Sequence, residues 1–142
     1  MRKGVDYPGV SLCFVCHDGN GRFLLQKRTK QCRDEHNTWD TGAGGLRFGE
    51  AVLDGLKREL REELNVEPLA IEFLGFREAH REHNGEQTHW IALDHKVLID
   101  PAHVKIGEPH KISEVKWFTL DEFPSPLHSM VPLFFSMHKN KL

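Results

Sequence analysis

One stretch constrains this chain more than any other. Residues 44–66, GGLRFGEAVLDGLKRELREELNV, join a glycine-rich turn to a helix crowded with carboxylates. Glu59, Glu62 and Glu63 share one patch at helical spacings of three and four residues, where like charges repel each other. Four leucines form a separate narrow stripe at about 100° per residue, which predicts the face that packs on the core: Leu53, Leu56, Leu60 and Leu64.

This acidic patch has two interpretations. A glutamate-rich helix face is commonly just a solvated surface. The glycines before the helix favour a different role, because such residues accept positive φ angles and let the backbone approach a ligand closely: Gly42, Gly44, Gly45 and Gly49. Hard divalent cations prefer several carboxylate oxygens together with water and substrate phosphate. We therefore expect a divalent-metal site that takes a diphosphate.

The spacing of these residues resembles the box of the Nudix hydrolase family (MutT-like), G-x(5)-E-x(7)-R-E-U-x-E-E-x-G-U, in which U is aliphatic. Gly44 takes the first position, Glu50 follows after five residues, and seven more lead to residues 58–66, RELREELNV. Asn65 replaces the second glycine, and asparagine is the residue that next most readily accepts the left-handed conformation at a helix end. The resemblance implies an α+β protein with the Nudix fold, an α/β/α sandwich with a mixed central β-sheet, formed by residues 1–142 as a single domain.

The resemblance also implies the roles of the box residues. Mg²⁺ or Mn²⁺ is expected as the cofactor, with Glu59, Glu62, Glu63 and the main-chain carbonyl of Gly44 as metal ligands. Arg58, Glu62 and Glu63 form the expected catalytic set, in which Arg58 orients a glutamate. A surface salt bridge between Arg58 and Glu62, one helical turn apart, is the structural alternative.

Four further residues are expected to contact the substrate. Arg28 ends a segment, LQKR, that resembles the same region of Nudix proteins, and Trp39 is a candidate for stacking on a base, although a core position is the alternative for an aromatic residue. Glu50 begins the helix, where it caps, binds metal, or does both. Glu108 lies in the downstream loop IGEPHK. The group that takes a proton from water is either a box glutamate or Glu108, with a plain surface role as the alternative for Glu108.

The rest of the chain has a hydrophobic pattern that predicts five strands and a C-terminal helix. The segment 80–89, HREHNGEQTH, is expected to be a polar loop that turns at Asn84-Gly85. Five phenylalanines are assigned to the core: Phe73, Phe76, Phe118, Phe134 and Phe135. The expected strands and helix are Gly9–His17, Arg22–Arg28, Leu69–Glu78, Trp90–Ile99 and Val115–Phe118, then Val131–Met137.

Length and charge limit the partners. The chain has 142 residues, 28% of them charged, and a net charge of −2, which is typical of one soluble domain. Its positive charge is dispersed, so we expect a small nucleotide as the substrate and no nucleic-acid polymer. No secretory signal or transmembrane run is present, so neither membrane association nor export is expected. A homodimer is left open.

Cysteine and histidine spacing suggests no zinc site. The three cysteines are an odd number, which favours a reducing cytoplasm over a disulfide framework. Cys13 and Cys16 have C-x-x-C spacing, but in an extended strand they point to opposite faces. His80, His83 and His89 have loose ligand-like spacing, yet no cysteine lies nearby and their segment reads as a loop.

The leading hypothesis is a metal-dependent pyrophosphohydrolase. It would cleave a nucleoside diphosphate linked to another moiety, with a (d)NTP or a damaged nucleotide preferred, to give a nucleoside monophosphate and the phosphorylated remainder. The alternatives are a hydrolase of ADP-ribose or another nucleotide sugar, an enzyme similar to isopentenyl-diphosphate isomerase, and a non-catalytic ligand-binding module.

Overall fold

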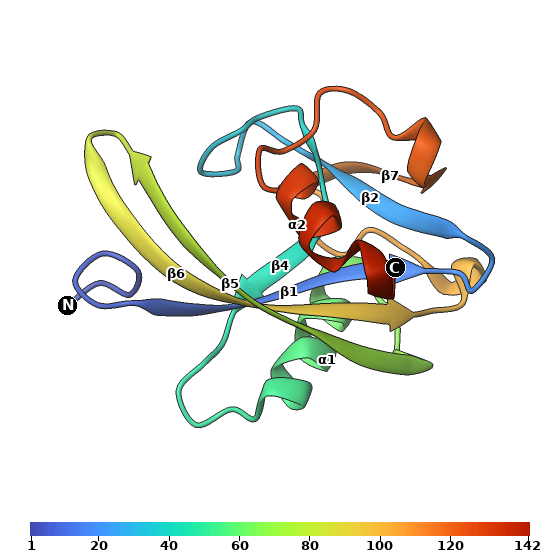
Figure 1. Ribbon diagram of the computed structural model, residues 1–142, viewed down its shortest axis with the longest axis horizontal. Coiled ribbons are helices and arrows are strands. Elements are labelled where there is room, and N and C mark those ends of the chain that lie inside the picture. The colour runs from blue at the N-terminus through green and yellow to red at the C-terminus, as the bar shows by residue number, and fades with distance from the viewer.

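The computed structural model describes residues 1–142 as one mixed β-sheet with a helix on each face (Figure 1). Strands β1 and β6 pair in parallel, and the other strand pairs are antiparallel. The sheet order is β3-β2-β1-β6-β5, with β4 also paired to β1 and β7 to β2. This confirms the expected α+β Nudix-type sandwich. The strands are β1 (Gly9–His17), β2 (Arg22–Arg28), β3 (Trp39–Asp40), β4 (Gly42–Gly45), β5 (Ala70–His83), β6 (Glu86–Leu98) and β7 (Ile112–Thr119).

Five helical segments complete the chain. The two α-helices are α1 (Val52–Leu64) and α2 (Val131–His138). Three short 3-10 turns follow β6, follow β7 and end the chain: η1 (Pro101–His103), η2 (Leu120–Glu122) and η3 (Lys139–Lys141). None of these helices has the length and apolar character needed to cross a membrane.

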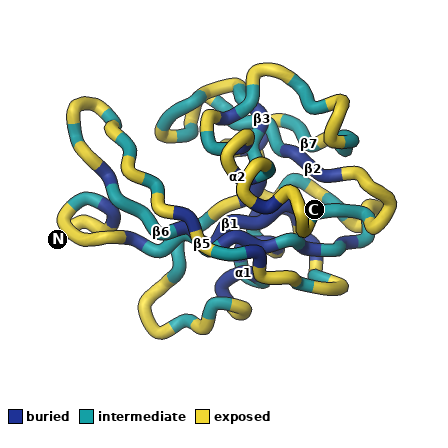
Figure 2. The backbone as a smooth tube through the Cα atoms, viewed as in Figure 1, coloured by how far each residue is buried: buried dark blue, intermediate teal, exposed yellow.

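Strand β1 divides the core into two layers because its side chains alternate between the faces. Phe14 and Cys16 pack with the leucines of α1, whereas Cys13 and Val15 pack with Phe134 of α2. The buried centre of the sheet is visible in Figure 2. The two cysteines therefore lie on opposite faces as predicted, and burial raises the pKa of the Cys13 thiol to about 12.

A buried ion-pair group holds α2 to the sheet. The guanidinium of Arg77 on β5 donates to both carboxylate oxygens of Asp94 on β6, at 2.5 and 2.9 Å. The His138 ring nitrogen Nε2 lies 2.7 Å from the same carboxylate. All three side chains are at most 5% exposed, so their polar groups depend on one another for the interactions that water no longer provides.

Several core assignments were wrong. Leu53 is 53% exposed in the first turn of α1, while Leu56, Leu60 and Leu64 are buried as expected. Phe73 and Phe76, both on the edge strand β5, are 55% and 62% exposed. Of the other phenylalanines Phe134 is buried, and Phe118 and Phe135 are half-buried.

The polar segment 80–89 is a hairpin and not a loop, which is a second correction. Strands β5 and β6 remain paired as far as His83 and Glu86. Asn84 and Gly85 form the turn, with φ angles of 52° and 78°, the signs that a tight two-residue hairpin requires. The turn prediction is confirmed. The sequence did not predict strands here because the side chains of this segment are polar. Neither face of the hairpin end packs under a hydrophobic layer, so no alternating apolar pattern is present.

Asn65 ends α1 in the left-handed conformation, with φ 56° and ψ 35°. Its backbone N–H donates to the carbonyl of Arg61, and its side-chain amide donates to the carbonyl of Lys105 at 2.9 Å. The asparagine therefore supplies the conformation expected of glycine and adds a link to the segment before β7. The departure from the box pattern leaves the helix end intact.

Replacement of Asn65 tests this cap. Asn65→Ala should lower the free energy of unfolding by about 1–2 kcal/mol, because alanine pays the left-handed strain and loses the amide bond. Asn65→Gly loses only the bond and should destabilise less. Urea denaturation measures both variants, and equal destabilisation by alanine and glycine would contradict the role of the φ angle.

Candidate functional site

The glycines of β4 bring a strand backbone into direct contact with the carboxylates of α1. A Cβ atom added to Gly44 would lie 2.0 Å from Cδ of Glu59, and one added to Gly42 would lie 2.1 Å from the ring of Phe14. Among the four glycines of the turn, only Gly49 has a positive φ. Close approach, rather than unusual φ, is thus the reason why β4 contains glycine.

Arg58 is the centre of an ion-pair cluster beside this contact. Its guanidinium donates to both oxygens of Glu50, at 2.7 and 2.9 Å, and to Glu59 at 2.5 Å. It also reaches Glu62 at 3.3 Å and the carbonyl of Gly45 at 3.1 Å. The hydrogen bonds from Arg58 hold the pKa of Glu50 at about 2. The salt bridge to Glu62, which was the alternative for Arg58, is present, and Arg58 also contacts Glu59.

Glu50 and Glu62 do not line the cavity next to the box. Glu50 gives no side-chain cap to α1, and both of its oxygens are taken by Arg58. The Glu62 side chain is 40% exposed and lies between Arg58 and Arg47. Glu50, which precedes α1, pairs with Arg58, and Glu62 on α1 faces Arg58 and Arg47. The substrate contact of Glu50 and the metal ligation by Glu62 stay predictions.

Glu59 and Glu63 do line that cavity, together with Gly44, Arg28 and Glu108. Glu63 is 5% exposed. One of its oxygens accepts a hydrogen bond from Gln26 at 2.9 Å, while the other is buried without a hydrogen-bond partner. A buried, unpartnered carboxylate oxygen is costly. A divalent cation held by these oxygens fits the site because it would supply the missing interaction.

The two inward carboxylates have raised pKa values. Burial is the main cause for Glu63, whose pKa lies well above the ordinary 4.5, and the charges of Glu59 and Glu108 add to the effect. For Glu59, burial outweighs the bond from Arg58. The negative charge expected here is therefore unfavourable until positive charge enters the cavity.

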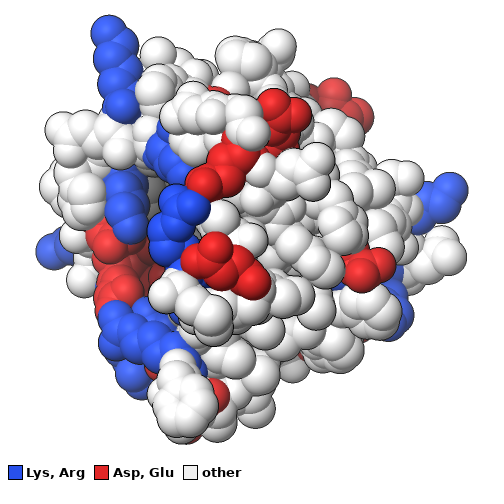
Figure 3. All heavy atoms as spheres, turned by 90° about the vertical axis from the view of Figure 1, so that its left-hand side faces the viewer, with Lys and Arg blue, Asp and Glu red and all other residues white.

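A second and larger cavity of about 480 Å³ continues from the first. Both are bordered by Arg28, Asp40, Gly44 and Lys111. The larger one extends between the β5–β6 hairpin and the loop after β2. Acidic and basic side chains gather around a hollow on this side of the molecule (Figure 3). The arrangement provides a carboxylate-lined end for phosphates and room beyond it for another group.

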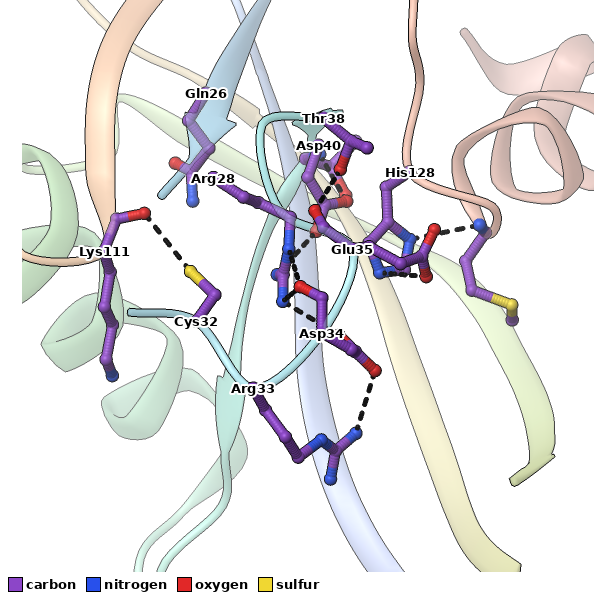
Figure 4. A network of polar contacts seen from close by, with 12 residues as sticks. Gln26, Arg28, Cys32, Arg33, Asp34, Glu35, Thr38, Asp40, Lys111 and His128 are labelled. Carbon is purple, nitrogen blue, oxygen red and sulfur yellow. Dashed lines mark hydrogen bonds and ion pairs between the residues drawn. The ribbon is translucent and has the colours of Figure 1, made fainter. Parts of the chain in front are cut away.

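The loop of residues 29–38 is held as a wall of this cavity by a polar network (Figure 4). Arg28 donates to the carboxylate and the carbonyl of Asp34, both at 3.0 Å, and to Asp40 at 3.4 Å. Arg28 thus lines both cavities, although most of its hydrogen bonds are already directed to the loop. Sequence reasoning gave no role to Asp34 or Asp40.

Glu35 ties this loop to two distant segments. Its carboxylate accepts hydrogen bonds from the backbone and hydroxyl of Ser129, at 2.7 and 2.8 Å, and from Arg81 at 2.5 Å. The His128 ring lies 2.9 Å away. Burial alone would raise the pKa of Glu35, but the bonds from Ser129 and the charges of His128 and Arg81 lower it overall. These contacts outweigh a strained left-handed φ of 46°.

Trp39 lies in the core, which was the alternative for this residue. It is 6% exposed, and its ring packs edge-on against Phe118 with 5.4 Å between centroids. The side chain does not line either cavity. The sequence missed Glu35, Arg81 and His128 because their contacts join positions up to 94 residues apart, which leaves no local pattern.

Comparison with known proteins decides the family. The model described as "NUDIX domain" matches residues 7–134. The chain belongs to the NUDIX family. It is 26% identical to a MutT NUDIX hydrolase from Burkholderia pseudomallei, with a TM-score of 0.81 over 93% of this chain and 98% of that one. As a family member it is a hydrolase acting on phosphoanhydride bonds, and divalent metal is the general cofactor of such enzymes.

Other relatives are more distant or longer. An RNA pyrophosphohydrolase from Acinetobacter baylyi is 29% identical, with 78% of this chain and 71% of that protein covered. Nudix hydrolase 6 from Arabidopsis thaliana is 28% identical, but the match spans only 40% of its length. The NUDIX domain of Shewanella oneidensis NrtR, solved with ADP ribose, shares the fold at a TM-score of 0.73 and 18% identity, over 96% of this chain and 89% of that one.

The raised pKa of Glu63 predicts how stability depends on pH. The folded protein keeps a proton on Glu63 that the unfolded chain releases above about pH 4.5, so the contribution of Glu63 to the stability of the metal-free protein should decrease as pH rises. Glu63→Gln should weaken this loss and raise the melting temperature in EDTA at neutral and higher pH. Mg²⁺ should stabilise the parent and have less effect on the variant.

Thermal unfolding over a pH series, in EDTA and in Mg²⁺, measures this effect. Glu67→Gln is the matched control because Glu67 is exposed and pairs only with Arg61. If the melting temperatures of the parent and of Glu63→Gln in EDTA changed in parallel across the pH series, the burial argument for Glu63 would be contradicted.

Replacement of Glu35 should make the loop of residues 29–38 more mobile, because Glu35 holds it to Ser129 and Arg81. In Glu35→Ala, the donors on Ser129 and Arg81 lose their acceptor, which should cost about 1–3 kcal/mol of unfolding free energy. Trypsin should then cut faster after Lys30 and Arg33, as followed by mass spectrometry. Glu122→Ala, at an exposed position, is the control. Unchanged cleavage in Glu35→Ala would show that the loop is held by other contacts.

Proposed function

We propose that this chain is a metal-dependent pyrophosphohydrolase that cleaves a nucleoside diphosphate linked to another moiety. The observation that carries the proposal is the pair of inward carboxylates that line the cavity next to the box: Glu59, which packs against the backbone of Gly44, and Glu63, which has an unpartnered oxygen. A nucleoside triphosphate, (d)NTP or damaged, is the preferred substrate. Its products would be a nucleoside monophosphate and pyrophosphate.

Glu59, Glu63 and the Gly44 carbonyl would hold Mg²⁺ or Mn²⁺. The oxygen-only donor set suits these hard cations, and the unpartnered oxygen of Glu63 supports it as a ligand. A bound cation neutralises phosphate charge and makes water more acidic. Glu62 lies further out, so we assign it to the outer edge of the site. Arg58 acts as a positioning residue that fixes the Glu59 carboxylate.

The chain must also accept the proton of the attacking water. Water adds to one phosphorus, the bridging P–O bond breaks, and the leaving phosphate takes the bond electrons. Glu108 lines the cavity with both box carboxylates, and no lysine or arginine forms an ion pair with it. We assign proton acceptance to Glu108. Lys111 and Arg33, which border both cavities, provide positive charge for the outer phosphates.

ADP-ribose is the second candidate substrate. The cavity beyond the carboxylates has a volume of about 480 Å³ and is bordered by Trp90 and Thr88, which leaves space for a sugar. The NrtR domain of the same fold was solved with ADP ribose. The RNA pyrophosphohydrolase relative adds RNA as a third class to test. Intact box glutamates argue against a module without catalysis.

A substrate panel tests the proposal. (d)NTPs, oxidised dNTPs, ADP-ribose, isopentenyl diphosphate and a 5′-triphosphorylated RNA oligonucleotide are incubated with EDTA, Mg²⁺ or Mn²⁺, and the products are separated by chromatography. Metal-dependent release of a monophosphate is expected from at least one nucleotide. Reaction in H₂¹⁸O shows which phosphorus is attacked. No metal-dependent cleavage of any compound would overturn the proposal.

Variants separate the assigned roles. Glu59→Gln and Glu63→Gln should lower kcat by at least about a hundredfold through lost metal binding, and Glu108→Gln should lower it by about 10²–10⁴-fold. Glu67→Gln serves as the surface control. A Glu108→Gln enzyme with unchanged kcat would remove Glu108 as the base and return that role to a box glutamate.

A further inference from the structure

The outer half of the β5–β6 hairpin carries a group of metal-ligating side chains far from the box in sequence. Glu78 and His80 follow each other on one face of β5, and His89 on β6 is the direct cross-strand partner of His80. One ligand atom from each side chain lies within 4.8 Å of the other two. The hairpin projects from the body of the molecule, and its outer end is largely exposed (Figures 1 and 2).

The contacts within this group leave a ligand atom unused. The two imidazole rings are stacked, with 4.1 Å between centroids. Nε2 of His89 is shielded from solvent and has no hydrogen-bond partner. The nearest carboxylate oxygen, Oε1 of Glu78, is 4.0 Å away, which is too far for a hydrogen bond. Nε2 of His89 is therefore a polar atom that is shielded from water and lacks a hydrogen-bond partner.

We propose that Glu78, His80 and His89 form a second metal site, which binds Zn²⁺ or a similar divalent transition ion. Two imidazoles and one carboxylate are a donor set suited to these ions, with water in the fourth position. A tetrahedral ion needs ligand atoms about 3.3 Å apart. Small rotations of exposed side chains bring the present atoms to that spacing.

The site is chemically and spatially separate from the box. The box offers oxygen ligands, which suit Mg²⁺, whereas this group offers nitrogen. Neighbouring side chains on the opposite face of the hairpin line the larger cavity: Ala79, Arg81, Thr88 and Trp90. Because side chains alternate along a strand, the metal group points away from that cavity. An ion there would link the two strands that form one wall of the cavity.

The pairing register of β5 and β6 also explains why the spacing of histidines in the sequence did not identify Glu78, His80 and His89 as a group. His83 seemed to belong with His80 and His89, but it lies an odd number of residues from His80 and so points to the other face. Glu78 takes its place. The earlier objection to zinc, that the segment is a loop, no longer applies, since paired strands hold the positions.

Calorimetric titration with ZnCl₂ tests the proposal on tag-free full-length protein in millimolar Mg²⁺. One equivalent should bind. His80→Ala and His89→Ala should weaken binding by more than about tenfold, and Glu78→Gln should weaken it while both imidazoles remain. His83→Ala, in the same hairpin but on the opposite face, should bind like the parent. A Glu59→Gln/Glu63→Gln protein should also keep the site.

NMR of the histidine rings gives a residue-level check in the same samples. Zinc should shift the imidazole signals of His80 and His89 and leave that of His83 unchanged. The proposal is overturned if the parent binds no zinc in Mg²⁺, if all three histidine variants bind equally, or if binding disappears only in the Glu59→Gln/Glu63→Gln protein. Circular dichroism confirms that each variant is folded.

Discussion

The contact between the carboxylate of Glu59 and the backbone of Gly44 is the constraint on which the site depends. Any side chain at position 44 would occupy the place of that carboxylate. Leu56, Leu60 and Leu64 hold α1 to the sheet, and the glycine strand allows the helix to lie close enough for its acidic side to meet β4. The leucines and the glutamates therefore lie on two sides of one helix. Burial of the leucines stabilises the helix on the sheet and offsets the repulsion between the glutamates.

The charges around this contact are divided between two environments. Arg58 neutralises the outer carboxylates, and its hydrogen bonds keep Glu50 ionised. Glu63 lies behind them with one oxygen unpartnered, so its charge is disfavoured in the metal-free protein. The ion pairs of Arg58 thus stabilise the fold, whereas the unpartnered carboxylate of Glu63 remains available to bind a cation. This division is typical of sites built for a cation.

The β5–β6 hairpin and the loop after β2 extend the site beyond the carboxylates. Strand alternation gives the hairpin one face toward the cavity and another toward solvent. Glu35 fastens the loop to Ser129 near α2 and to Arg81 on the hairpin. The buried Asp94 group then holds α2 against the same sheet. Three segments distant in the chain become one wall through charge-assisted hydrogen bonds.

Local patterns in the sequence were sufficient for much of this architecture. The spacing of residues 44–66 predicted the helix, three of the four leucines on its buried face and the family, and the family model confirms the last. Asn84-Gly85 predicted the hairpin turn, and strand alternation placed Cys13 and Cys16 on opposite faces. The family prediction rests on the fixed spacing of residues along the box. The other predictions rest on neighbours within one helix, turn or strand, where geometry is fixed by the backbone period.

The tertiary structure decided which side chains are buried and which residues distant in sequence are in contact. Leu53, Phe73 and Phe76 are apolar residues in regular positions, yet each is more than half exposed. The contacts of Glu35 and the grouping of Glu78 with two histidines also have no local signal, since they depend on strand register and on segments far apart in sequence. The sequence by itself determined the helix, the box and the chemistry of its oxygens. Only the fold decided which oxygens are buried, because desolvation depends on everything that packs around a group.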